Sequence, residues 1–132
     1  KDVKDTRGQD IYRDATNHCL RSKQWARGAE LLLRAGGMCE AAGARAGMSR
    51  AYLGAVVVQL YGGQVGPAWA TYQDCLAVDS FASSDAAHAA DRLFTAYRSG
   101  SASAVVAAVK GAPEFSHALD NAVARLAKKL PT

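Results

Sequence analysis

The chain has 132 residues, a formal net charge of +4 and three cysteines. This length allows one domain with a real core, and the mild positive charge without a dense Lys/Arg cluster argues against a nucleic-acid-binding protein. The charge would suit an acidic protein or an anionic membrane surface, although the longest apolar run, at residues 51–61, is too short to cross a bilayer. Abundant alanine favours closely packed helices, so we expect an all-α chain.

Two segments that lie forty residues apart share a pattern. The positions Tyr12, Ala15, Cys19, Trp25, Gly28, Leu32 and Ala35 align with Tyr52, Ala55, Gln59, Val65, Ala68, Tyr72 and Cys75. In each segment an aromatic residue opens a helix, a short polar or Gly-rich turn follows, and a small residue lies in a second helix. This is the plan of a helix-turn-helix repeat of the tetratricopeptide kind, and such arrays typically bind other proteins.

The first segment predicts two helices, at residues 3–21 and 24–42. Apolar residues recur at helical spacing in both. The buried positions expected are Ile11, Tyr12, Ala15, Cys19 and Leu20 in the first helix, and Trp25, Ala29, Leu32, Leu33 and Cys39 in the second. Gly36 and Gly37 interrupt the second helix and cost roughly 1 kcal/mol each against alanine, so we expect close contact with a neighbouring helix there.

The stretch at residues 48–61 is apolar almost all round and predicts a helix covered on both sides. Three adjacent valines, Val56 to Val58, would by themselves favour a strand, but the repeat register favours a helix. The Gly62-Gly63 pair ends this helix. Pro67 fits the first turn of the next helix, which we expect to extend to Val78.

The second half predicts three further helices. A loop at residues 80–85 ends in a cap from Ser83 or Ser84, and a short helix stops at Gly111 to Pro113. The buried positions expected are Ala86, Ala90, Leu93, Phe94 and Tyr97 in the fifth helix, Val105, Val106 and Val109 in the sixth, and Phe115, Leu119, Ala122, Val123, Leu126 and Leu130 in a last helix at residues 114–130. The prediction is a single domain, residues 1–132, of seven antiparallel helices stacked as hairpins.

No residue pattern indicates a catalytic, cofactor or metal site. The cysteines, Cys19, Cys39 and Cys75, form no CxxC pair and fall on predicted helices, which indicates buried thiols and a reducing cytosolic compartment. The histidines, His18, His88 and His117, have no second histidine at helical spacing. His117 and Asp120 are one turn apart, and we interpret them as a surface pair. The chain is therefore not expected to be an enzyme.

Basic residues accumulate in the first half. They are Arg21, Lys23, Arg27, Arg34, Arg45 and Arg50. One interpretation is a solvated outer face, and the other is a partner-binding face. If these residues bind a partner, their replacement by alanine should weaken association and flatten its salt dependence.

In order along the chain, many short patterns resemble the soluble NSF attachment protein family, the gamma form in particular. They are Lys23-Gln24-Trp25-Ala26, Gly28-Ala29-Glu30-Leu31-Leu32, Ala55-Val56-Val57-Val58-Gln59-Leu60, Phe81, Ser84-Asp85, Leu93-Phe94, Ala96-Tyr97, Gly100, Val105-Val106, Val109, Phe115, Leu119-Asp120-Asn121, Arg125-Leu126-Ala127 and Leu130-Pro131. The resemblance covers nearly all the chain and corresponds to the C-terminal half of the family.

The resemblance implies a cytoplasmic vesicle-trafficking adaptor without cofactors, made of tetratricopeptide-like hairpins ending in a small C-terminal helical bundle. It implies SNARE complexes along one face, recruitment of the ATPase NSF through the C-terminal part, and peripheral association with membranes. The partner-binding residues expected are Arg125, Lys128, Lys129 and Leu130 at the C-terminal end, with Arg21, Lys23 and Arg27 in the first hairpin.

The C-terminal sequence departs from the family pattern, and an alternative function remains open. The alpha form ends in an acidic tail that contains leucine, whereas this chain ends in Lys128-Lys129-Leu130-Pro131-Thr132. The chain is expected to be the C-terminal fragment of a longer array, and exposed apolar residues such as Val3 or Ile11 would indicate that hairpins precede it. The alternative function is a helical-repeat scaffold for another large partner.

Overall fold

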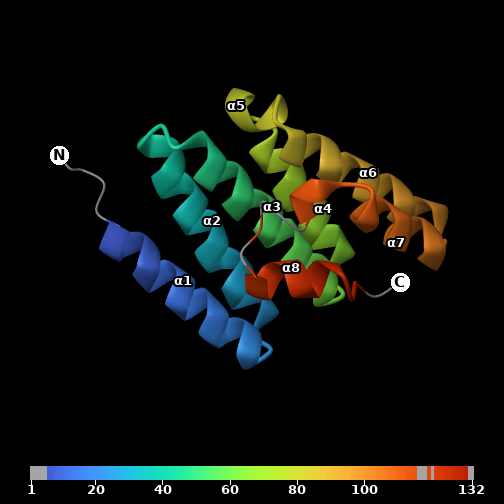
Figure 1. Ribbon diagram of the computed structural model, residues 1–132, viewed down its shortest axis with the longest axis horizontal. Helices are drawn as coiled ribbons and strands as arrows, with labels where there is room; N and C mark the ends of the chain where they lie inside the picture. The colour runs from blue at the N-terminus through green and yellow to red at the C-terminus, as the bar shows by residue number, and fades with distance from the viewer. Residues whose placement is uncertain (1–5, 116–118, 120, 131–132) are drawn as a thin grey trace.

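A computed structural model describes residues 6–115, 119 and 121–130, and these are helical apart from short connections. Helices α1, α2 and α3 run side by side in alternating directions, and α8 lies across α3 (Figure 1). The elements are α1 Thr6–Arg21, α2 Trp25–Ala41, α3 Arg45–Tyr61, α4 Val65–Cys75, α5 Asp79–Ala82, α6 Asp85–Ser99, α7 Ala102–Lys110, the 3-10 helix η1 Pro113–Phe115, and α8 Asn121–Ala127. The all-α prediction is confirmed.

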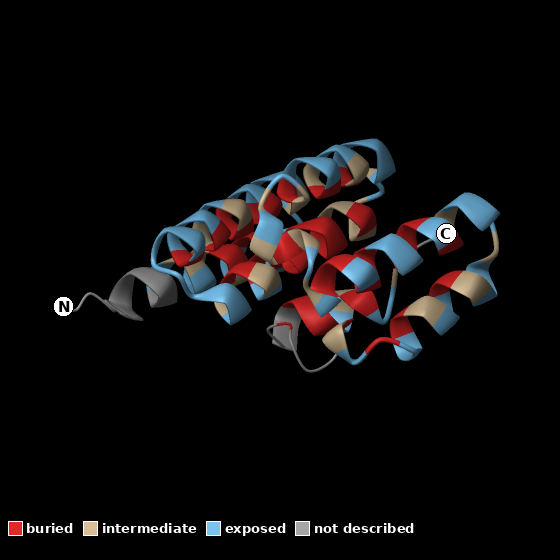
Figure 2. Ribbon diagram, turned by 90° about the horizontal axis from the view of Figure 1, so that it is seen from above, coloured by how far each residue is buried: buried red, intermediate tan, exposed pale blue. Residues whose placement is uncertain are grey.

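Helix α3 forms the centre of the core. It packs against α2, α4, α5, α6 and α8, and every residue from position 51 to position 58 is buried. The buried residues, red in Figure 2, gather along the inward faces of the surrounding helices. A helix covered on several sides must be apolar all round. This burial explains why Val56 to Val58 form a helix, as the repeat register predicted, despite their preference for strands.

The same turn joins α1 to α2, α2 to α3 and α3 to α4. Its central residue has a positive φ each time, at Lys23 (61°), Gly43 (75°) and Gly63 (78°), so the turns recur every 20 residues. In each turn the next backbone N–H donates back to a carbonyl five residues earlier: Gln24 to Cys19 at 2.8 Å, Ala44 to Cys39 at 2.8 Å and Gln64 to Gln59 at 2.9 Å. These are Schellman motifs, which satisfy the last carbonyls of one helix before the next begins.

Lys23 is the non-glycine residue in this series, so Lys23→Gly is expected to stabilise the fold by about 1 kcal/mol, because a left-handed φ strains any residue with a Cβ. Urea unfolding measures the change. Gly63→Ala is the matched control, since its Cβ would meet nothing within 4 Å. It should destabilise the fold by a similar amount, and an unchanged midpoint for both variants would contradict this account of the turns.

Two glycines allow aromatic side chains to approach another helix. A Cβ on Gly36 of α2 would collide with the ring of Tyr52 on α3, and a Cβ on Gly62 would lie 2.8 Å from Trp25. The Trp25 ring also packs edge-on against Tyr61, with centroids 5.0 Å apart. The close contact predicted for the Gly36-Gly37 pair is therefore confirmed at Gly36. Gly37 is exposed, with nothing near its missing Cβ.

The hydroxyl group and the ring of Tyr52 each contact another residue. Its hydroxyl donates to Glu40 Oε1 at 3.0 Å, and its ring packs edge-on against Phe81, with centroids 5.6 Å apart. Burial and then the hydrogen bond to Glu40 raise the pKa of Tyr52 from its ordinary value of 10.0 to about 12. The neutral phenol is thus the form that the folded chain stabilises.

The stability of the fold is expected to fall as the pH rises from about 10 to about 12. In that interval the unfolded state releases the Tyr52 proton while the folded state retains it, so the stabilising contribution is complete below pH 10.0 and is lost near about 12. Urea unfolding at pH values across this range measures the slope. Tyr52→Phe removes the group and should make the slope shallower. An identical slope in both proteins would contradict the assignment.

The second half contains more elements than the three helices predicted. Ser84 caps α6, as expected, by accepting from the Ala87 N–H at 3.2 Å. Most of α5 lies within the loop predicted at residues 80–85, and this helix places Phe81 at full burial against the core. The prediction of seven helices is therefore wrong, since eight α-helices are present in the described parts of the chain.

The single helix predicted for residues 114–130 is also wrong. Over the residues that the structure describes there, η1 ends at Phe115, Leu119 lies in a bend, and α8 spans Asn121–Ala127. Phe115 is fully buried, and η1 packs against both α6 and α7. A tight turn that buries Phe115 between two helices therefore replaces the first part of the predicted helix.

Two predicted core positions lie at the surface. Ile11 is 68 % exposed and Val106 is 48 % exposed. Helix α1 packs chiefly against α2, and α7 against α6 and η1, so one side of each is left open. Tyr12 and Ala15, predicted to be buried, are half-buried. The predictions at Val3, His117, Asp120 and the Ala122 side chain lie outside the described residues.

Candidate partner-binding surfaces

The first predicted basic group lies at the turn between α1 and α2. Arg21 ends α1, Lys23 lies in the turn, and Arg27 is in the first turn of α2; all three are exposed. Arg27 and Arg34 both donate to the carboxylate of Glu30, at 2.8 and 3.0 Å. The hydrogen bond from Arg27, with the charges of both arginines, lowers the pKa of Glu30. Arg27 and Arg34 thus form part of a solvated ion cluster on one helix.

The second predicted group lies on α8 and just after it. Arg125, Lys128 and Lys129 are exposed, and Leu130 is half-buried. Helix α8 packs against α3, whereas the α1–α2 turn lies at the lower edge of Figure 1. Lys128 and Leu130 also line a small cleft against α7. The two predicted groups therefore belong to different elements of the fold.

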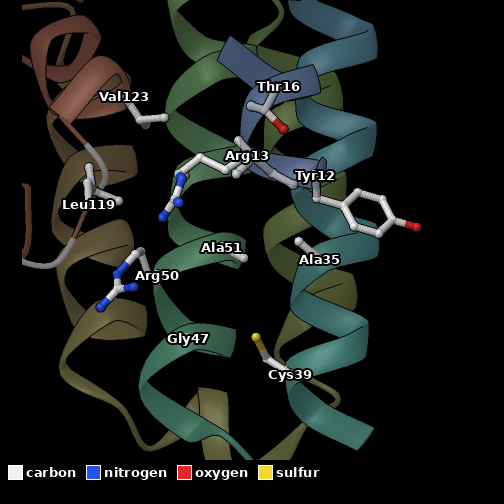
Figure 3. Close-up of a pocket in the computed structure, with 12 residues that line it drawn as sticks. Tyr12, Arg13, Thr16, Ala35, Cys39, Gly47, Arg50, Ala51, Leu119 and Val123 are labelled. Carbon is white, nitrogen blue, oxygen red and sulfur yellow. The ribbon is translucent and has the colours of Figure 1, made fainter. Parts of the chain in front are cut away.

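A pocket that the sequence did not predict lies between α1, α2, α3 and the start of the α8 region (Figure 3). It has a volume of about 100 Å³, and its lining includes small residues of α2 and α3: Ala35, Gly47, Ala51 and Gly54. Thr16 of α1 is 3 % exposed and faces it. Arg13, Arg50 and Leu119 also line this pocket. The small residues on facing helices were the available sequence signal, but spacing alone does not show which helices face each other.

An aromatic groove lies between α4 and α6. It is lined by Val65, Trp69, Phe94, Tyr97 and Arg98. The Arg98 guanidinium lies over the Trp69 ring, 4.5 Å from its centroid, and the Trp69 ring packs edge-on against Phe94 at 5.1 Å. The sequence analysis predicted burial of Phe94 and Tyr97 but not this stacking, because the two helices meet only in the folded chain.

Burial in the core keeps several titratable side chains in their neutral forms. Burial raises the pKa of the Cys75 thiol to about 12, and burial likewise raises the pKa of Tyr72 and Tyr97. A nucleophilic thiol requires the opposite shift. Within the described residues, no three His, Cys, Asp or Glu side chains gather to hold a metal ion, and no helix is long and apolar enough to cross a membrane.

Cys75 in the folded chain is expected to resist iodoacetamide at mildly alkaline pH, because the thiol is buried and its pKa is about 12. The label should appear once urea unfolds the chain. Mass spectrometry after timed quenching measures the modified fraction. Modification of Cys75 in the native chain at the rate of the unfolded one would contradict this placement.

Comparison with known proteins identifies one relative over the full length of the chain. No protein-family model matches, and no solved structure matches. The chain is 33 % identical over 132 residues to the gamma-soluble NSF attachment protein of Arabidopsis thaliana, and it spans 45 % of that protein's length. The resemblance read from the residue patterns is thereby confirmed. This chain is therefore similar to gamma-soluble NSF attachment protein along all of its 132 residues, and it spans about 45 % of that relative's length.

Proposed function

We propose that this chain is part of a vesicle-trafficking adaptor that binds SNARE complexes and recruits the ATPase NSF for their disassembly. The 33 % identity to gamma-soluble NSF attachment protein over all 132 residues carries the proposal. The function is non-catalytic, and the site of action is the cytoplasm, at the surface of membranes.

The helical arrangement supports a role as a binding array. The turns centred on Lys23, Gly43 and Gly63 repeat one geometry at equal spacing, which we interpret as tetratricopeptide-like hairpins. The exposed Ile11 on α1 would suit a face that a further hairpin covers in a longer array. By this proposal residues 1–132 form one helical domain of the adaptor.

The proposed contacts are the two basic groups. Arg125, Lys128, Lys129 and Leu130 are assigned to the partner at the C-terminal end, and Arg21, Lys23 and Arg27 to the first hairpin. Arg21 and Lys23 have exposed side chains at a turn. Because Arg27 already pairs with Glu30, we expect Arg21 and Lys23 to contribute more to binding than Arg27.

Direct binding of the purified chain to the N-terminal domain of NSF, with and without an assembled SNARE bundle, tests the proposal. Binding should be saturable, and the Lys128→Glu/Lys129→Glu variant should change its affinity and its salt dependence, because both lysines are exposed charges. Arg92→Glu, a charge reversal at an exposed residue of α6, should leave it unaltered. A folded chain that binds neither partner would contradict the proposal.

A helical-repeat scaffold for another large partner is the second candidate. The observation that favours it is the turn geometry that recurs at Lys23, Gly43 and Gly63, since helical hairpins of one geometry serve many partners. Recovery of a stable partner other than SNAREs or NSF, through the same basic residues, would favour this function.

A further inference from the structure

A cleft between α7 and α8 combines an apolar floor with a basic rim. The buried side chains of Val105, Val109 and Ala127 form the floor. Lys110 from the end of α7 and Lys128 from just after α8 line it on its polar side and are exposed. The two lysines come from different helical regions of the chain, and both line this cleft.

The apolar part of the cleft remains open to solvent. Val106 is 48 % exposed and Leu130 is half-buried, although both line the cleft. The free volume is about 60 Å³. One water molecule needs roughly 10–15 Å³, so the cleft can accept an apolar group larger than water. Contact between an apolar recess and water is unfavourable, so a partner side chain that fills the recess gains binding free energy.

The two charged residues that line the cleft, Lys110 and Lys128, are both basic. The sequences of α7 and α8 contain Lys110 and Arg125 and no acidic residue, and Lys128 and Lys129 follow directly. The next acidic residue along the chain after α7 is Glu114, half-buried in η1. Cations with like neighbours at the rim of an apolar recess favour a partner with the opposite charge.

We propose that the cleft binds an acidic amphipathic segment of a partner protein, which inserts one apolar side chain between Val106 and Leu130 and places carboxylates beside Lys110 and Lys128. A recess for one side chain suits an anchor residue of a protein segment, whereas an anionic lipid surface would need the basic residues alone. The inference rests on the proposed adaptor function, because that function is the reason for expecting a protein as the partner. It adds the chemistry that the partner must present.

The test uses a fluorescein-labelled helical peptide that carries one leucine flanked by glutamates, titrated with the full chain and followed by anisotropy. We expect saturable binding that weakens at least about tenfold for Lys110→Glu/Lys128→Glu, since each attraction becomes a repulsion. A peptide with serine in place of leucine should also bind at least about tenfold more weakly. Val106→Asp should have the same effect as the serine peptide, because it puts a charge at the recess.

Arg92→Glu is the control for charge reversal, because Arg92 is exposed and lies on α6, away from the basic groups proposed to bind. Its affinity should stay within about twofold of the unchanged chain. Circular dichroism confirms that each variant is folded. Equal binding of the acidic peptide to the reversal variant and the control would overturn the inference, and so would equal binding of the leucine and serine peptides.

Two further outcomes separate this inference from its basis. If the chain binds anionic phosphatidylserine vesicles but not the peptide, the basic rim contacts a membrane and the inference is wrong. If the peptide binds as expected while the NSF domain and the SNARE bundle do not, the cleft is retained and the adaptor function fails. If NSF binds but the peptide does not, the adaptor function stands and the cleft is not its acidic contact.

Discussion

Phe81→Ala is expected to lower the free energy of unfolding by about 3–5 kcal/mol, the largest effect of any substitution considered. Phe81 is fully buried, on a helix of four residues that has little else to fix it to the core. Its ring packs edge-on against Tyr52 at 5.6 Å, and α5 contacts both α3 and α6. Truncation removes the apolar surface and leaves a cavity at the junction of these helices.

Urea unfolding followed by circular dichroism measures this change, with an unchanged slope showing that the same transition is observed. Val106→Ala is the matched control, because Val106 is an apolar residue at the surface. Its effect should stay within about 0.5 kcal/mol. A loss of less than about 1 kcal/mol for Phe81→Ala would contradict the placement of α5 in the core.

Gly36→Ala and Gly37→Ala are expected to have opposite effects although the two glycines are adjacent. A Cβ at position 36 would collide with the Tyr52 ring, so the substitution should destabilise the fold by about 2–3 kcal/mol through displacement of that ring. A Cβ at position 37 would meet nothing within 4 Å. That substitution should stabilise the helix by up to about 1 kcal/mol, since alanine is the better helix former.

The pair is its own control, because both substitutions add the same methyl group to the same helix. Thermal and urea unfolding measure the two changes. The Gly36→Ala variant should also weaken the hydrogen bond from Tyr52 to Glu40, which ultraviolet titration of the tyrosines would detect as a lower pKa of Tyr52. Equal shifts of the two variants would contradict the close packing of α2 on α3.

Elements that form one long periodic face could be predicted from the sequence. The helices α2, α3, α4, α6 and α7 lie where apolar spacing, glycine pairs and Ser84 placed them. The ends that were predicted for α2, α3, α4 and α7 lie within three residues of the observed ends. Local chemistry determines these elements: periodicity sets the buried face, and caps or glycines set the ends.

Features that depend on the neighbouring element could not be predicted in this way. Periodicity places Ile11 and Val106 on apolar stripes, but only the packing of α1 on α2 and of α7 on α6 shows that their sides stay uncovered. The pattern at residues 114–130 fits one helix, yet burial of Phe115 between α6 and α7 requires a tight turn. Tertiary packing overrides local periodicity at these positions.

The candidate surfaces were predicted only in part for the same reason. The basic residues Lys128 and Lys129 are evident in the sequence, and the structure shows them exposed. The cleft that joins Lys128 to Lys110 depends on the approach of α7 and α8, and no spacing along the chain reports it. Likewise, the structure shows that Arg27 pairs with Glu30. The sequence analysis did not separate the basic residues that form ion pairs from the others.

Recruitment of NSF to an immobilised SNARE bundle tests the adaptor function most directly. Biolayer interferometry would record NSF binding to the bundle before and after loading of this chain. The proposal predicts no stable NSF signal without the chain and a saturable signal with it, reduced by Lys128→Glu/Lys129→Glu. A folded chain that binds neither the SNARE bundle nor NSF would contradict the adaptor function and favour the scaffold. A chain that binds the bundle without retaining NSF would do the same.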